Sequence, residues 1–373
     1  MRLLLLDQFS DPGGAQQVLL ELLAAIRERG WKALVGLPGE GEMFQRVRAL
    51  GFEAQRVDCG PYASGRKSAM DVARFLKGTP RLARQIEVMA KRVEAGLIYV
   101  NGPRLVPASA RARLPAPVLF HAHSYVPPGA ARMLTGRCLR GMRAWVLGTC
   151  RFVAEPWREY VAAERFSVVY NGVAGPSGAG PAPSRGRSGT CRTIGCIGRI
   201  APEKGQREFL AAASIIHGAV PDCRFFVYGA ALFSAADALR YDAEVRASAA
   251  GLPVEFPGWT TDVYGALASL DLLLVPSAAH EATTRVILEA FAAGVPVIAF
   301  RAGGIPEVVD HNVDGLLADS TEEMARMAIE LLTGDPARLR SISESARATW
   351  RRRFTLEAYH RQVLGLMQKI AAV

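Results

Sequence analysis

The sequence has little that would place it inside a membrane or stabilise it through disulfides or metal ions. No apolar run approaches the roughly 20 residues that a membrane-spanning helix needs. Met1–Leu6 begins like a secretion signal, but Asp7 interrupts it after four leucines, so we expect a first buried strand. The six cysteines form no Cys-x-x-Cys pair and have no histidine at zinc spacing. Reduced, buried thiols in the cytoplasm are therefore expected.

Acidic residues are outnumbered by basic ones, and the net charge of +10 indicates a surface suited to anions. Nucleotides, an anionic membrane face and nucleic acid all fit this charge. The densest basic runs are Arg132–Arg143 and Arg347–Arg353, and neither is regularly interleaved with stacking aromatics, so nucleic acid is not expected. Both runs can be solvated helix faces, and for Arg132–Arg143 peripheral contact with the inner face of a membrane is the second reading.

Strand and helix patterns alternate along the first half of the chain, which predicts a parallel sheet wrapped by helices. Pro80 is expected to break the third helix. The predicted strands are 3–6, 32–37, 53–57, 97–100, 117–120, 146–150 and 167–170, and the predicted helices are 15–29, 44–50 and 70–96.

A stretch rich in Gly, Pro and Ser divides the chain of 373 residues near its middle. It contains no large apolar residue, which predicts an exposed linker between two α/β domains. We therefore predict an N-terminal domain over 1–174, a linker over 175–190, a C-terminal domain over 191–353 and a terminal helix over 354–373.

The second half is organised around the run from Glu281 to Ala299. The apolar run 270–275 before it indicates a strand, and the polar residues from Glu281 lead into an apolar helix that Gly294 ends. In a parallel sheet, ligands lie at the carboxyl ends of strands against helix N-termini. Glu281 and the amides of Thr283 to Arg285 are therefore expected there, with Glu289 about five residues into the helix, roughly 7 Å along its axis.

The spacing Glu281-x7-Glu289, followed by Ala-Phe-Ala-Ala-Gly-Val-Pro-Val, resembles the signature of the family-4 retaining glycosyltransferases with the GT-B fold. The resemblance implies two Rossmann-like domains facing a central cleft, with a C-terminal helix crossing back to the first domain. It also implies that Glu281 lies at the donor sugar and that Glu289 holds the ribose hydroxyls. Thr283 and Thr284 replace the aromatic and glycine usual in the family, so the sugar pocket is expected to differ.

The loop Gly198-Arg-Ile-Ala-Pro-Glu-Lys-Gly205 resembles the phosphate loop of the same family. Arg199 can fork onto two phosphate oxygens and Lys204 supplies a point charge, so together they could stabilise a diphosphate leaving group. No Asp-x-Asp pair is present to hold a metal with the diphosphate, so metal independence is expected. Solvated charges are the alternative reading of this loop.

Three further segments resemble family elements. Gly13 and Gly14 match a first loop that faces the acceptor and the donor phosphates. Trp259 lies in a turn that borders the nucleotide base in the family, although a packing role is equally open. In His121-Ala-His123, the second histidine better matches the residue that reaches the donor sugar, with the register uncertain by two residues; a structural or metal-binding histidine pair is the alternative.

The sequence thus predicts a cytoplasmic, metal-independent retaining glycosyltransferase that moves a sugar from a nucleotide-sugar, with UDP favoured, to an acceptor hydroxyl. The acceptor could be a sugar, a lipid-linked glycan or a small molecule. Two alternatives remain: a hydrolase or epimerase of sugar nucleotides on the same fold, and a basic nucleic-acid or membrane binding protein with a degenerate donor site.

Overall fold

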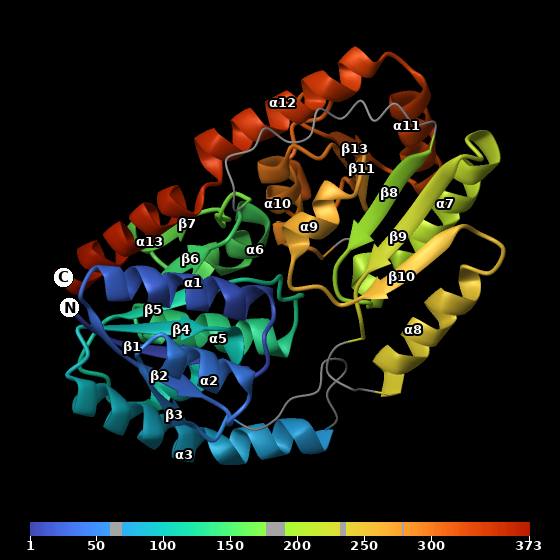
Figure 1. Ribbon diagram of the computed structural model, residues 1–373. Helices are drawn as coiled ribbons and strands as arrows, with labels where there is room; N and C mark the ends of the chain where they lie inside the picture. The colour runs from blue at the N-terminus through green and yellow to red at the C-terminus, as the bar shows by residue number, and fades with distance from the viewer. Residues whose placement is uncertain (60–68, 177–190, 232–235, 278–279) are drawn as a thin grey trace. The chain divides into compact units, whose positions relative to one another are not determined.

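The computed structural model describes residues 1–59, 69–176, 191–231, 236–277 and 280–373, and Figure 1 traces the chain. The chain forms two compact units: unit 1 comprises residues 1–170 and 359–373, and unit 2 comprises residues 171–358. Most of the predicted linker, from 177 to 190, lies outside the described residues.

Unit 1 is built on a seven-stranded parallel sheet with the order β3-β2-β1-β4-β5-β6-β7. The chain builds outward from β1 in one direction and then from β4 in the other, which makes the β1–β4 boundary a topological switch point. The strands are β1 Arg2–Asp7, β2 Lys32–Leu37, β3 Glu53–Arg56, β4 Leu97–Asn101, β5 Val118–Ala122, β6 Trp145–Gly148 and β7 Phe166–Val168.

Helices cover this sheet, and α4 contacts both α3 and α5. Their apolar residues lie against the strands; Leu19, Leu22, Leu23 and Ile26 of α1, for example, are fully buried. The helices are α1 Gly14–Glu28, α2 Glu42–Ala49, α3 Ala69–Val93, α4 Val106–Arg111, α5 Ala130–Gly141, α6 Arg151–Ala154 and most of the terminal α13 Leu356–Ala371.

Pro80 does not break α3, so that expectation was wrong. A proline inside a helix removes one backbone hydrogen bond and costs about 3 kcal/mol. Beyond it, α3 buries Leu82, Ile86, Met89 and Ala90, and this packing holds the second half in place. Tertiary burial therefore outweighs the local cost of the proline.

Unit 2 repeats the design with a six-stranded parallel sheet of order β10-β9-β8-β11-β12-β13. Its switch point lies between β8 and β11. The strands are β8 Arg192–Ile197, β9 Cys223–Tyr228, β10 Val254–Gly258, β11 Leu272–Val275, β12 Val297–Phe300 and β13 Leu316–Ala318. The helices are α7 Gln206–Ala219, α8 Ala236–Ser248, α9 Val263–Ala268, α10 Arg285–Ala293, α11 Thr321–Thr333 and α12 Pro336–Arg353.

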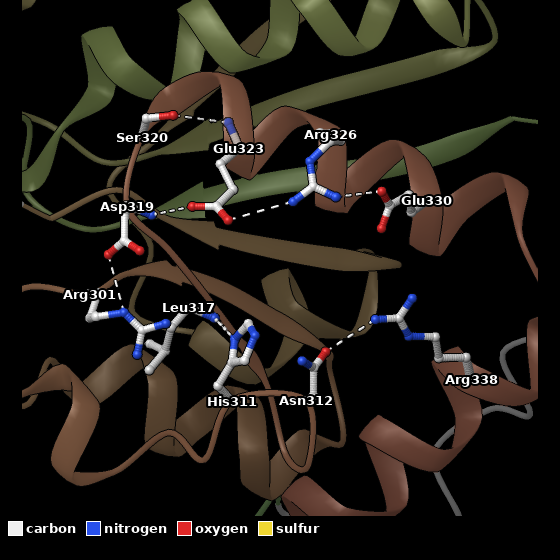
Figure 2. Close-up of polar contacts among 10 residues, drawn as sticks. All are labelled: Arg301, His311, Asn312, Leu317, Asp319, Ser320, Glu323, Arg326, Glu330 and Arg338. Carbon is white, nitrogen blue, oxygen red and sulfur yellow. Dashed lines mark hydrogen bonds and ion pairs between the residues drawn. The ribbon is translucent and has the colours of Figure 1, made fainter.

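Local chemistry explains where α11 begins. The N-cap residue Ser320 accepts a hydrogen bond from the Glu323 amide through its hydroxyl, and the Glu323 carboxylate accepts one from the amide of Asp319, the residue before the N-cap, so the arrangement resembles a capping box (Figure 2). Along the exposed side of the helix, Arg326 pairs with both Glu323 and Glu330.

The terminal helix α13 places its apolar side chains in the core of unit 1: Tyr359, Val363, Leu364, Met367 and Ile370 are buried. The predicted return of the last helix to the first domain is thus confirmed. Among the described residues, no helix combines the length and apolar character needed to cross a bilayer.

Candidate functional site

In unit 2, two loops meet at the switch point between β8 and β11. Lys204 follows β8 and Glu281 follows β11, and the Lys204 Nζ lies 2.5 Å from the Glu281 Oε2. Both side chains are largely shielded, at 23% and 13% exposure. The sequence predicted both residues for one site, and the structure brings them into direct contact.

Two glycines allow these loops to approach so closely. Gly205 has φ of +72°, and a Cβ there would lie 1.9 Å from the Pro276 carbonyl oxygen at the end of β11. Gly303 has φ of +54°, and a Cβ there would lie 1.9 Å from the Glu281 carbonyl oxygen. The Gly304 amide donates to that same oxygen at 3.0 Å. The loop that follows β12 therefore packs against the Glu281 backbone and is hydrogen-bonded to it.

Arg199 lies on the same loop as Lys204 and forms an ion pair with Glu203, four residues later. The backbone beneath Arg199 is held by Gln206, whose carboxamide donates to the Arg199 carbonyl at 2.8 Å and accepts from the Ala201 amide at 3.2 Å. Gln206 is fully buried. Sequence reasoning missed this residue, although a glutamine opening an apolar helix was a possible signal. The predicted Gly198 has φ of +156° just before Arg199.

Helix α10 carries the remaining predicted donor residues of unit 2. Thr284 is its N-cap residue and Arg285 its first helical residue. Glu289 lies one turn on, 3.7 Å from Arg285, with the two side chains 15% and 16% exposed. The rest of α10 is buried, so the charged pair occupies its one polar stripe.

Trp259 follows β10 and is 54% exposed. Gly258 before it has φ of +89°, which turns the chain out of the strand. A tryptophan that packs into a core would be far more covered. The exposure argues against the packing alternative, and the role of Trp259 at the nucleotide base stays a prediction.

In unit 1, the two predicted histidines lie together at the end of β5. His121 is fully buried and shares a hydrogen bond of 2.5 Å between its Nδ1 and the Tyr99 hydroxyl. His123 lies one residue beyond the strand, with its ring centroid 3.9 Å from that of His121. Among the described residues, no group of three or more His, Cys, Asp or Glu could hold a metal ion.

Burial keeps both imidazoles neutral. It lowers the pKa of His123 to about 3, and together with the neighbouring His123 it lowers the pKa of His121 well below its usual range. A neutral imidazole can donate or accept a hydrogen bond but brings no positive charge. Tyr99 engages the Nδ1 of His121, and the buried Nε2 of each histidine has no hydrogen-bond partner among the described residues. The assignment of His123 rather than His121 to the donor sugar stays a prediction.

A buried polar network at the switch point of unit 1 was not predicted. Asp7 ends β1 and accepts hydrogen bonds from the Asn101 side chain, from Gln16 at 2.9 Å and from the Phe9 amide at 2.8 Å. Burial raises its pKa to about 6 against the opposing effect of these bonds. Because Gln16 belongs to the first turn of α1, the network fixes the start of that helix.

The predicted glycines Gly13 and Gly14 lie at the start of α1 that this network holds. Gly13 is the N-cap residue in an extended conformation. A Cβ at Gly14 would meet no atom within 4 Å, so open space borders this backbone. The N-terminus of a helix with open space before it is a suitable place for an anion.

The two parallel sheets, each with polar loops at its switch point, place the chain among the doubly wound α/β proteins, whose ligands bind at the carboxyl ends of the strands. Two family descriptions match the chain: "Glycosyltransferase Family 4" over residues 12–174 and "Glycosyl transferases group 1" over residues 191–334. The chain therefore belongs to the family-4 glycosyltransferases with the GT-B fold, as its motifs predicted.

Curated relatives share segments of the chain. A D-inositol 3-phosphate glycosyltransferase of Segniliparus rotundus is 34% identical over 170 residues, 43% of this chain and 37% of the relative. A GDP-mannose-dependent monoacylated alpha-(1-6)-phosphatidylinositol monomannoside mannosyltransferase of Corynebacterium glutamicum is 29% identical over 195 residues, 49% of each chain. The chain thus spans about a third to a half of these relatives' lengths.

A solved structure covers more of the fold. The Anabaena protein HepE in complex with UDP superposes with a TM-score of 0.81 and 25% identity, covering 99% of this chain and 100% of that one.

Proposed function

We propose that the protein is a retaining glycosyltransferase that moves a sugar from a nucleotide-sugar to an acceptor hydroxyl without a metal ion. The observation that carries this proposal is the contact between Lys204 and Glu281 at the switch point of unit 2. It gathers a phosphate-binding cation and a sugar-binding carboxylate where parallel sheets bind ligands.

In this proposal, negative charge grows on the diphosphate as the glycosidic bond breaks. Arg199 and Lys204, which lie on one loop, would stabilise that negative charge. Gln206 and Gly205 already fix the backbone of this loop, so little reorganisation would be needed during the reaction. Glu289 would accept hydrogen bonds from the ribose hydroxyls, with Thr284 and Arg285 beside it, and Trp259 would border the base. His123 would bind a sugar hydroxyl as a neutral imidazole.

Retention fits an attack on the same face that the diphosphate leaves, with a leaving phosphate oxygen taking the acceptor's proton. Glu281 is the carboxylate that we assign to the donor sugar. Its ion pair with Lys204 supports a positioning role over that of a free nucleophile. The protein would thus bind and orient both substrates and stabilise the leaving group.

UDP is the favoured donor nucleotide because the similar HepE structure was solved with UDP. The mannosyltransferase relative is named for GDP-mannose, so GDP is the competing choice. Acceptors in the relatives' names are an inositol phosphate and a phosphatidylinositol mannoside, which supports a sugar, polyol or glycolipid acceptor.

Peripheral contact with an anionic membrane face is the second part of the proposal. Helix α5, in the basic run predicted for this role, exposes Met133 and Leu134 beside Arg137 and Arg140. Helices α3 and α5 both contact α4. Helix α3 also exposes apolar and basic side chains, namely Met70, Val72, Leu76, Arg74 and Lys77. Apolar side chains flanked by basic ones suit the interface of an anionic bilayer.

Co-sedimentation with vesicles tests the membrane contact. We expect binding to phosphatidylcholine vesicles that contain phosphatidylglycerol, and weaker binding in a Met133→Ser, Leu134→Ser double variant. Leu239→Ser on α8, which removes an even more exposed apolar residue of unit 2, serves as the control. Absence of binding to anionic and neutral vesicles alike would refute the contact.

The donor site is tested by thermal unfolding with UDP, GDP and their sugars in EDTA. A ligand that binds only the native state raises the midpoint, so we expect a shift with one nucleotide that disappears in Arg199→Ala. Absence of a shift with any nucleotide would favour a basic binding protein instead. Turnover of the bound sugar nucleotide without acceptor would favour a hydrolase or epimerase.

A further inference from the structure

Both cations of the phosphate loop are already paired with carboxylates. Lys204 contacts Glu281, and Arg199 contacts Glu203. A diphosphate that binds to Arg199 and Lys204 must therefore compete with protein carboxylates for them. The two carboxylates differ in how firmly the fold holds them.

Glu281 is held from several sides. Its side chain is 13% exposed, and its backbone is clasped by Gly303 and by the Gly304 amide. Lys204 and Glu281 come from loops that follow two adjacent strands, so separating them would require those loops to move. This pair belongs to the fixed frame of the site.

The fold constrains the Glu203 side chain less than it constrains that of Glu281. Its side chain is 52% exposed, and it lies on a single 3-10 turn, Pro202–Lys204, between Arg199 and α7. Water can solvate its carboxylate as soon as it leaves Arg199. The Arg199 backbone would stay in place meanwhile, because Gln206 holds its carbonyl oxygen.

We propose that Glu203 is an exchangeable partner of Arg199: it occupies the guanidinium in the empty site and is displaced by the diphosphate of the nucleotide. This inference rests on the proposed donor site. A diphosphate offers more negative charge and a geometry that the guanidinium fork can bind in two places, so it outcompetes one half-exposed carboxylate. On product release Glu203 returns to Arg199, which favours departure of the nucleotide.

Glu203 is thus a positioning residue that lowers nucleotide affinity. Exposed ion pairs contribute little, so the cost of displacing this one corresponds to about a two- to fivefold change in Kd. Glu203→Gln keeps the size of the side chain and removes its charge. We expect it to bind UDP or GDP about two- to fivefold more tightly than the unchanged protein in low salt, with a smaller gain at high salt.

The experiment is calorimetric titration of the full chain with UDP and with GDP, for the unchanged protein and four variants. These are Glu203→Gln, Arg199→Ala, the two combined, and Glu244→Gln. Glu244 is the matched control because it is a half-exposed partner of Arg207, another arginine of unit 2. We expect Glu203→Gln to tighten binding more than Glu244→Gln does, and to have no effect once Arg199 is absent.

The variants test the exchange at Glu203 separately from the donor site at Arg199. If Arg199→Ala weakens binding but Glu203→Gln leaves it unchanged or weakens it, the exchange is refuted and the donor site stands. A gain in Glu203→Gln that persists in the Arg199→Ala background would also refute the exchange, since the effect would be general electrostatics. If Arg199→Ala binds as the unchanged protein does, the donor site itself is wrong.

Discussion

The two units share a sheet design but prepare their switch points in opposite ways. In unit 1 the polar groups at the strand ends are buried and, for His121 and His123, kept neutral. In unit 2 they are charged and paired across loops, as with Lys204 and Glu281. The difference fits the proposed function, in which Arg199 and Lys204 of unit 2 bind the charged diphosphate and the neutral His123 of unit 1 binds a sugar hydroxyl.

The largest expected effect comes from removing charge in unit 2. Arg199→Ala should lower kcat/KM for transfer by about 10²- to 10³-fold, because a fixed group that stabilises developing charge is lost. Arg207→Ala, which removes an arginine paired with Glu244 on the surface, should change it little. Steady-state kinetics measures both, and equal effects would contradict a special role for Arg199.

The next effect concerns the glycines that position each site. Gly303→Ala introduces a Cβ against the Glu281 carbonyl at a positive φ, and we expect a loss of about 1–3 kcal/mol in the free energy of unfolding together with reduced activity. Gly14→Ala meets open space in unit 1 and should leave stability nearly unchanged. Urea unfolding of both variants tests the contrast, which fails if Gly303→Ala is as stable as the unchanged protein.

Lowering the pH should reduce the free energy of unfolding of unit 1, because His123 is kept neutral in the folded protein. The folded pKa of His123 is about 3 against an ordinary 6.5, so the unfolded chain binds the proton first and stability falls as pH drops below 6.5. Between pH 6.5 and pH 5 this amounts to about 2 kcal/mol. His123→Gln lacks the titrating group, so its free energy of unfolding should fall less over that range.

Asp7 gives the free energy of unfolding the opposite pH dependence. Its folded pKa of about 6 lies above the ordinary 3.8, so its contribution to stability falls as pH rises through this window and is recovered on acidification. Measuring His123→Gln against the unchanged protein cancels the Asp7 effect, because both chains keep that residue. An identical pH dependence in the two proteins would show that His123 is not buried as a neutral group.

The smallest effect is expected for charges of unit 2 outside the site. Arg326→Ala removes the ion pairs with Glu323 and Glu330 on exposed α11 and should cost less than about 0.5 kcal/mol, with activity unchanged. Thermal unfolding and the transfer assay check this. A large loss of activity would mean that charge anywhere in unit 2 supports the site.

Much of this architecture could be predicted from apolar runs. The strand at 32–37, for example, has the bounds that its apolar residues indicated. The motif loops also follow the strands that were predicted to precede them. The predicted break at Pro80 was wrong because the packing of residues further along α3 offsets the hydrogen bond that the proline removes.

What could not be predicted depends on which strands are neighbours. Asp7 and Asn101 are far apart in the sequence, and they meet only because β1 pairs with β4. Gln206 reads as an ordinary helix residue until its two backbone contacts are seen. The need for glycine at Gly205 likewise arises from the carbonyl oxygen of Pro276, in a separate strand's loop.

The assignment of residues 359–373 to unit 1 has a consequence for synthesis on the ribosome. Unit 2 is one continuous segment and can fold once residue 358 has emerged. Unit 1 lacks the part of its core supplied by Val363, Met367 and Ile370 until this later segment is made. Translation of unit 1 therefore starts before that of unit 2 but is completed after it, and until then unit 1 presents apolar surface that chaperones can recognise.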